Sequence, residues 1–76
     1  MENINYVSNI IVNKENKLYK YNGKYYRMPV IDVLRKEARL VETDSKGNYL
    51  YDENEKTIKS DVDIDYFIDH AESIKL

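Results

Sequence analysis

The dipeptide Asn22-Gly23 is the feature that most restricts how this chain can fold. Tyrosine-rich segments flank it on both sides, and Asn-Gly readily adopts the two positive φ angles that a type I′ turn requires. The pattern predicts a β-hairpin over residues 18–28. Pairing across a two-residue turn places Tyr19 opposite Tyr26, so tyrosines cover much of one face of this hairpin.

Two interpretations compete for the segment after the hairpin. Its apolar residues cover about half of a helical wheel, and Pro29 occupies the first helical position, where proline is favoured. These signals predict a helix over residues 29–42. The β-branched residues of the segment favour the alternative, a second hairpin that turns near Arg35 and Lys36 and completes a small SH3-like barrel with a C-terminal helix.

The second half of the chain predicts short strands and one more helix. Residues 44–47 form a turn signal, and two short strands, 48–51 and 56–59, can follow on either side of an acidic turn. Ser60 is a good N-cap, and acidic residues gather in the following turn, where the helix macrodipole favours them. These end signals predict a C-terminal helix over residues 61–74.

The fold class that follows is α+β, in a single domain over residues 1–76. A Tyr-rich antiparallel sheet, with a further strand over 6–12, is expected to pack against the helices near 29–42 and 61–74. The predicted core comprises Ile10, Val12, Tyr19, Tyr21, Tyr26, Val30, Leu34, Ala38, Val41, Leu50, Ile58, Ile64, Phe67, Ile68 and Ala71.

Composition excludes several classes of function. The chain has no cysteine, which excludes disulfides, thiol nucleophiles and Cys-based zinc sites and favours the reducing cytoplasm. It shows neither a membrane-spanning run nor a signal peptide. With a single histidine, His70, and serines outside any nucleophile motif, we expect no enzyme activity and no cofactor.

A calcium site is also weighed and set aside. Asp61, Asp63 and Asp65 occupy positions one, three and five of a window that ends at Glu72, as in an EF-hand loop. The sixth position is Tyr66, where the sharp turn of such a loop needs glycine. An acidic first turn of a helix accounts for the same aspartates, so we expect no metal site.

Charge is distributed unevenly and points to a partner. Residues 1–43 carry eight Lys and Arg against five Asp and Glu, whereas residues 44–76 carry four against nine. An acidic array of this kind can steer a basic protein surface toward it. We therefore expect a protein-binding module that meets a basic surface of a host protein, including one that normally binds nucleic acid. The predicted contact residues are Asp52, Glu53, Glu55, Asp61, Asp65, Asp69 and Glu72.

The alternative function is nucleic-acid binding through the basic hairpin. Lys20, Lys24 and Arg27 would contact phosphates while Tyr25 stacks on a base. The acidic half of the chain repels phosphate, which makes this the less favoured hypothesis. No membrane partner is expected, and both a monomer and a homodimer are compatible with the sequence.

In size and composition the chain resembles the short accessory proteins of phages and mobile elements of low-GC bacteria. The resemblance rests on the abundance of Lys, Asn, Tyr and Asp, the absence of cysteine and the lack of a catalytic constellation. Many such proteins bind and inhibit host proteins, so the resemblance implies an inhibitor. It rests on no motif and assigns no functional residue.

Overall fold

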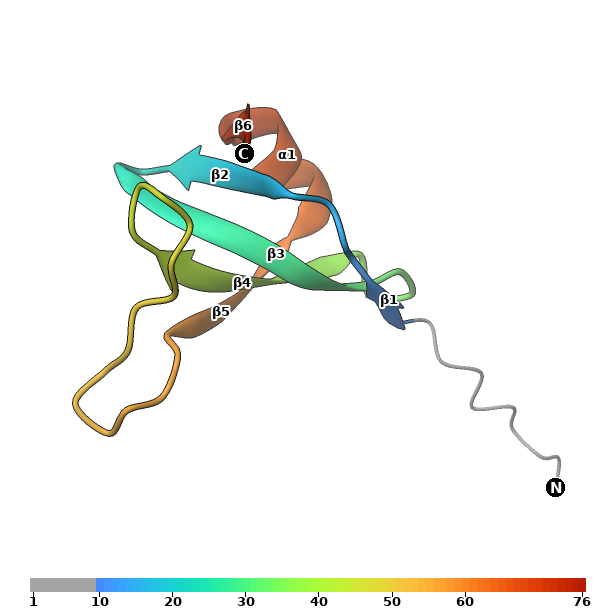
Figure 1. Ribbon diagram of the computed structural model, residues 1–76. Helices are drawn as coiled ribbons and strands as arrows, with labels where there is room; N and C mark the ends of the chain where they lie inside the picture. The colour runs from blue at the N-terminus through green and yellow to red at the C-terminus, as the bar shows by residue number, and fades with distance from the viewer. Residues whose placement is uncertain (1–9) are drawn as a thin grey trace, which may run out of the picture.

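The computed structural model describes residues 10–76, which form an α+β domain with a six-stranded antiparallel sheet and one short helix (Figure 1). The strands are β1 (Ile10–Val12), β2 (Lys17–Tyr21), β3 (Lys24–Asp32), β4 (Glu37–Thr43), β5 (Lys59–Asp63) and β6 (Glu72–Lys75), and α1 (Ile64–His70) lies between β5 and β6. Residues 6–9 of the strand predicted over 6–12 lie outside the described residues. No helix within residues 10–76 is long and apolar enough to cross a membrane.

The Tyr-rich hairpin is confirmed with the predicted register. Strands β2 and β3 pair antiparallel, with Tyr19 opposite Tyr26 and Lys20 opposite Tyr25. Asn22 and Gly23 have φ angles of 52° and 78°, as a type I′ turn requires. Local turn chemistry therefore decides this part of the fold.

The helix predicted over residues 29–42 is wrong, and the alternative hairpin is what the chain forms. Strands β3 and β4 pair with each other and turn over residues 33–36, where Lys36 adopts a positive φ of 55°. The β3–β4 register shifts between Arg27 and Val30, so Pro29 lies at an irregularity of the strand. A bulge is where a strand can accept a residue without an N–H.

The C-terminal helix is also shorter than predicted. Of residues 61–74, only Ile64–His70 are helical, because the residues before them pair with β4 and those after them pair with β2. The strands predicted over 48–51 and 56–59 reduce to isolated bridges, Thr43 to Tyr49 and Tyr51 to Thr57, and β5 begins at Lys59. Sheet pairing thus takes residues that local signals assign to a helix.

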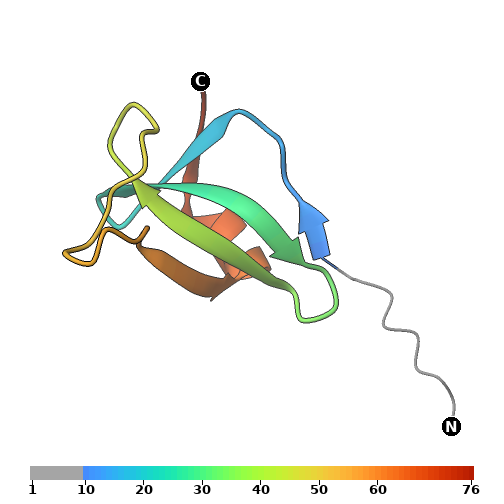
Figure 2. The ribbon, with the colours of Figure 1, turned by 60° about the horizontal axis from the view of Figure 1, so that its bottom comes forward.

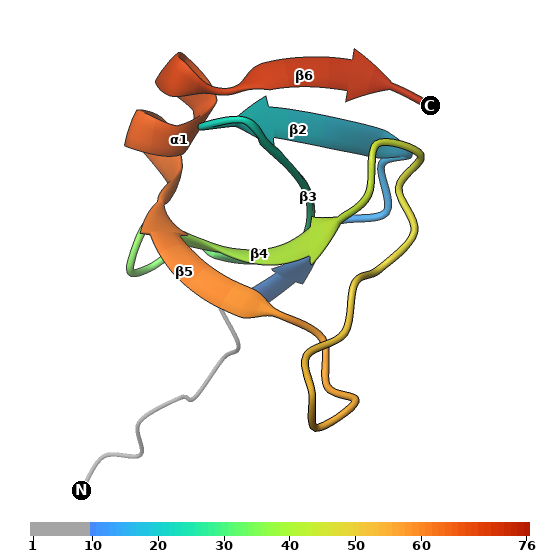
Figure 3. The ribbon, with the colours of Figure 1, turned by 90° about the vertical axis from the view of Figure 1, so that its left-hand side faces the viewer.

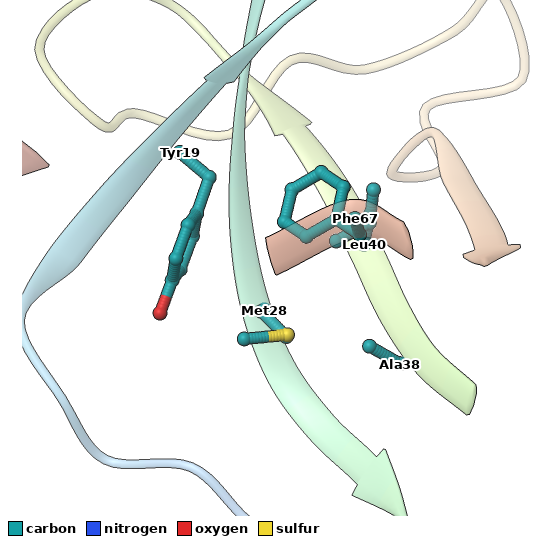
Figure 4. Packing of buried hydrophobic residues seen from close by; sticks show 5 residues of the cluster. All are labelled: Tyr19, Met28, Ala38, Leu40 and Phe67. Carbon is teal, nitrogen blue, oxygen red and sulfur yellow. The ribbon is translucent and has the colours of Figure 1, made fainter. Parts of the chain in front are cut away.

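The sheet curls around a core that α1 completes. Its strand order is β5-β4-β3-β2-β6, while β1 pairs with the far end of β3 beside the 33–36 turn (Figure 2). Figure 3 shows α1 crossing between the end of β5 and the start of β6. Phe67 of α1 is fully buried and meets side chains of β2, β3 and β4 inside the curl (Figure 4).

The buried residues agree only in part with the predicted core. Tyr19, Ala38, Val41 and Phe67 are buried as predicted, but Ile10, Val12, Leu34, Ile58 and Ile68 are exposed, and Leu18, Met28 and Leu40 are buried without having been predicted. Leu18 and Val41 lie on the outer side of the sheet from Tyr19 and Leu40, since neighbouring residues of a strand point to opposite faces. The loop that follows β4 covers this outer side, where Leu18 and Leu76 approach Gly47.

Tyrosines inside the curl predict sensitivity to high pH. Burial raises the pKa of Tyr19, Tyr21 and Tyr26 above the ordinary value of 10.0. A raised pKa in the folded state means that the stability these phenols contribute is present below pH 10 and is lost as the pH rises through their folded pKa values. We expect the urea midpoint to fall above pH 10, with tyrosinate absorbance rising together with unfolding. A midpoint that stays constant while all tyrosines ionise would contradict this.

Candidate protein-binding surface

Helix α1 is held by its two ends and by side chains that pack against the core. Asp63 caps it, accepting a hydrogen bond at 2.9 Å from the Tyr66 backbone N–H, and the Ala71 N–H donates to the Phe67 carbonyl at 2.8 Å. Phe67 is its only buried residue, with ring centroids of Tyr21 and Tyr19 at 5.2 and 5.5 Å. Ile64 is half-buried and also packs against the core, whereas the other residues of the helix are exposed.

The exposed side of α1 combines carboxylates with apolar side chains. Asp65, Ile68 and Asp69 are spaced i, i+3 and i+4, so they share one face of the helix. Tyr66 is 53% exposed and Ile68 is 49% exposed. We define the α1 surface as Asp65, Tyr66, Ile68, Asp69 and Glu72, the last at the exposed start of β6.

The carboxylates of the α1 surface form no ion pair within residues 10–76, although Glu72 lies opposite Lys20 across the β2–β6 pair. Within residues 10–76, the ion pairs use Glu15, Asp32, Glu42 and Asp61, and none involves Asp65, Asp69 or Glu72. Tyr66 is held in place from the other side, because its ring stacks on His70 at 3.9 Å between centroids. The α1 surface thus combines carboxylates that form no ion pair with a tyrosine ring that is held by stacking on His70.

The seven acidic residues predicted as one contact surface lie in three places. Asp65, Asp69 and Glu72 belong to the α1 surface, and Asp61 lies on β5. Asp52, Glu53 and Glu55 lie on the loop between β4 and β5, which extends away from α1 in both Figure 1 and Figure 3. Folding therefore separates the acidic loop from the acidic helix.

Two of these acidic side chains have clear local roles. Asp52 accepts hydrogen bonds from the backbone N–H groups of Asn54 and Lys56, at 2.8 and 3.0 Å, and so shapes the loop. Asp61 pairs with Arg39 of β4 through two hydrogen bonds, the shorter at 3.1 Å. Asp61 is neutralised by this pair and lends little charge to a partner surface.

The outer face of the sheet has a groove that the sequence analysis did not predict. It encloses about 300 Å³, and its lining includes Ile10, Val30, Asp32, Arg35, Arg39 and Asp61. Two intrachain ion pairs, Asp32 with Arg35 and Asp61 with Arg39, occupy much of its polar wall. The β3–β4 hairpin brings these residues together. The sequence analysis assigned residues 29–42 to a helix and therefore could not predict the groove.

The cations of the basic hairpin make contacts within the chain. The Lys24 Nζ lies 3.8 Å from Glu42, and the Arg27 Nε donates to the Gly47 carbonyl at 2.9 Å. Lys20 faces Glu72 across the β2–β6 pair and lies 5.8 Å from the Tyr25 ring centroid. The cations proposed to contact phosphate thus all make contacts within the chain, and Lys24 is the one of the three that forms an ion pair within residues 10–76.

The site contains no metal-binding cluster. No group of three or more His, Cys, Asp or Glu side chains within residues 10–76 is arranged to hold a metal ion. Asp63, one of the aspartates of the calcium-like pattern, instead caps α1. Comparison with family models, with curated proteins and with solved structures gives no match to this chain.

Proposed function

We propose that this chain is a non-enzymatic, cytoplasmic protein-binding module that contacts a basic partner through the α1 surface. The observation that carries the proposal is that Tyr66 and Ile68 are exposed beside Asp65 and Asp69, which form no ion pair within residues 10–76. Tyrosine is favoured at binding hot spots because it contributes a large contact area at low entropic cost. Unpaired carboxylates accelerate the encounter with a basic surface.

The chemistry of the partner follows from the same arrangement. The partner needs Lys or Arg side chains that reach Asp65 and Asp69, with an apolar patch between them to cover Ile68. A protein that normally binds nucleic acid carries such cations, and the carboxylates would occupy the positions of phosphates. We propose that the chain inhibits a host protein of this kind, as the resemblance to phage accessory proteins implies.

We also propose that the architecture is that of a small SH3-like barrel. The strand order β5-β4-β3-β2-β6 and the curl of the sheet around Phe67 support it. In such an arrangement α1 is a connection between two strands, and its outer side is free for a partner.

Charge reversal on α1 tests the proposed function. We expect Asp65→Lys with Asp69→Lys to weaken capture of the partner from host lysate by about tenfold or more, since two attractive pairs of about 0.2–1 kcal/mol each become repulsive. The matched control is Glu53→Lys with Glu55→Lys, which makes the same change in net charge on the separate loop. Circular dichroism verifies that both variants are folded.

The outcomes of this experiment separate the hypotheses. Equal losses in both double variants would show that net charge alone matters and would refute the α1 surface. Capture that disappears when the lysate is treated with nuclease would favour the basic hairpin. Retained capture by the Asp65→Lys, Asp69→Lys variant would exclude α1 as the contact.

A further inference from the structure

Strand β5 has one unpaired edge. Among the described residues it pairs with β4 alone. The Glu42 N–H donates to the Ile58 carbonyl and the Ile64 N–H to the Lys36 carbonyl, each at 2.9 Å, so the even-numbered residues of this segment bond to β4. Because hydrogen-bonded and non-hydrogen-bonded pairs alternate in antiparallel sheets, the N–H groups of Lys59, Asp61 and Asp63 point away from β4. β5 therefore offers a row of backbone donors and acceptors to another strand.

The charges along this edge are complementary to those of a second β5 strand that runs in the opposite direction. β5 reads Lys59-Ser60-Asp61-Val62-Asp63. When a second β5 runs antiparallel with Asp61 opposite Asp61, each Lys59 lies opposite an Asp63 of the other copy. Oppositely charged residues that face each other across strands stabilise the pair. The residues that meet in this register are those whose backbone groups point outward, so charge and hydrogen bonding agree.

The centre of this register is also compatible with pairing. Two facing aspartates would repel each other, but each Asp61 is bound to its own Arg39 at 3.1 Å. On the inner face, Ser60 of one copy meets Val62 of the other, and both are small side chains. Charged residues on an edge usually keep strands apart because like charges meet. Here the antiparallel reversal brings unlike charges together at both ends.

We propose that β5 pairs with β5 of a second copy of this chain, antiparallel about a twofold axis at Asp61. The two curled sheets then join into one continuous sheet, and the interface is isologous, with the same residues contributed by each copy. The α1 surface takes no part in this interface, so the dimer is independent of the proposed function.

Charge exchange at the two ends of β5 tests the dimer. We expect the unmodified chain to show a concentration-dependent dimer by sedimentation velocity between about 10 µM and about 1 mM. Lys59→Asp places Asp opposite Asp at both ends, and Asp63→Lys places Lys opposite Lys, so each variant alone is expected to dimerise at least about tenfold more weakly. An equimolar mixture of the two variants restores opposite charges at both ends and is expected to form the heterodimer, which native mass spectrometry distinguishes by mass.

The controls keep the test decisive. Asp63 also caps α1, so Asp63→Asn, which preserves the cap, separates loss of charge from loss of the helix. Lys59 is exposed and forms no ion pair within residues 10–76, so Lys59→Asp alone already tests the interface. A monomer up to about 1 mM, unchanged dimerisation of Lys59→Asp, or a series of larger oligomers from head-to-tail pairing of β5 with β6 would each overturn the proposal.

Discussion

Phe67→Ala is expected to bring the domain close to the midpoint of its unfolding transition at room temperature. Phe67 is fully buried, and three tyrosine rings surround it, the farthest with its centroid at 6.5 Å. Removing a buried phenylalanine costs about 3–5 kcal/mol, through lost burial and the cavity left behind. Small domains are stable by only about 5–15 kcal/mol. A chain of this length lies toward the low end, because it buries a smaller share of its surface.

Urea denaturation followed by circular dichroism measures this effect, and Ile68→Ala is the matched control. Ile68 is the next residue of the same helix but is 49% exposed, so its truncation is expected to change the free energy of unfolding by about 0.5 kcal/mol. Similar losses for the two variants would show that Phe67 does not anchor α1. A selective loss for Phe67→Ala would show that this side chain fastens the α1 surface to the sheet.

Gly47→Ala is expected to have the second largest effect on stability. Gly47 has a φ of 91°, and a Cβ there would lie 2.9 Å from Arg27 Nη2 and 3.2 Å from Leu76 Cδ1. A side chain at such a φ costs about 1–3 kcal/mol. The close contacts add to this cost, because the Arg27 guanidinium and Leu76 would have to move away from the new Cβ. The Arg27 hydrogen bond to the Gly47 carbonyl would weaken as the loop shifts.

Gly23→Ala separates the two contributions. Gly23 also has a positive φ, 78°, but a Cβ there would meet no atom within 4 Å. Gly23→Ala is therefore destabilised only by the positive φ of the backbone. The difference in unfolding free energy between the two variants measures the packing of the loop on the outer face. Equal destabilisation would mean that the loop does not pack tightly against Leu18 and Leu76.

The candidate surface was only partly predictable from the sequence. The exposure of Asp65 and Asp69 follows from helical periodicity, and the structure agrees with it. The prediction that Asp52 and Glu53 belong to the same surface is not met, because these residues lie on the loop between β4 and β5, which extends away from α1. The open edge of β5 was hidden as well, since residues 61–63 were assigned to a helix and Lys59 to the end of a separate strand.

The error over residues 29–42 has a specific cause. Apolar residues of a strand pair can imitate a helical period when both faces of the strands are partly covered. Here Ile31, Ala38 and Leu40 contribute to the core inside the curl, whereas Val41 is buried on the outer face. Val33 and Leu34 lie in the turn and are exposed. A helical wheel cannot distinguish this two-sided burial from one continuous apolar stripe.

The sequence by itself determined the features that depend on interactions between residues close together along the chain. These are the Asn22-Gly23 hairpin with its register and the presence of a helix turn around Phe67. The tertiary structure decided where that helix ends, because residues 72–75 form more hydrogen bonds by pairing with β2 than a fraying helix end would offer. It also decided the strand order. The partners in β2 and β6, such as Lys17 and Lys75, are far apart in the chain, and no local signal links them.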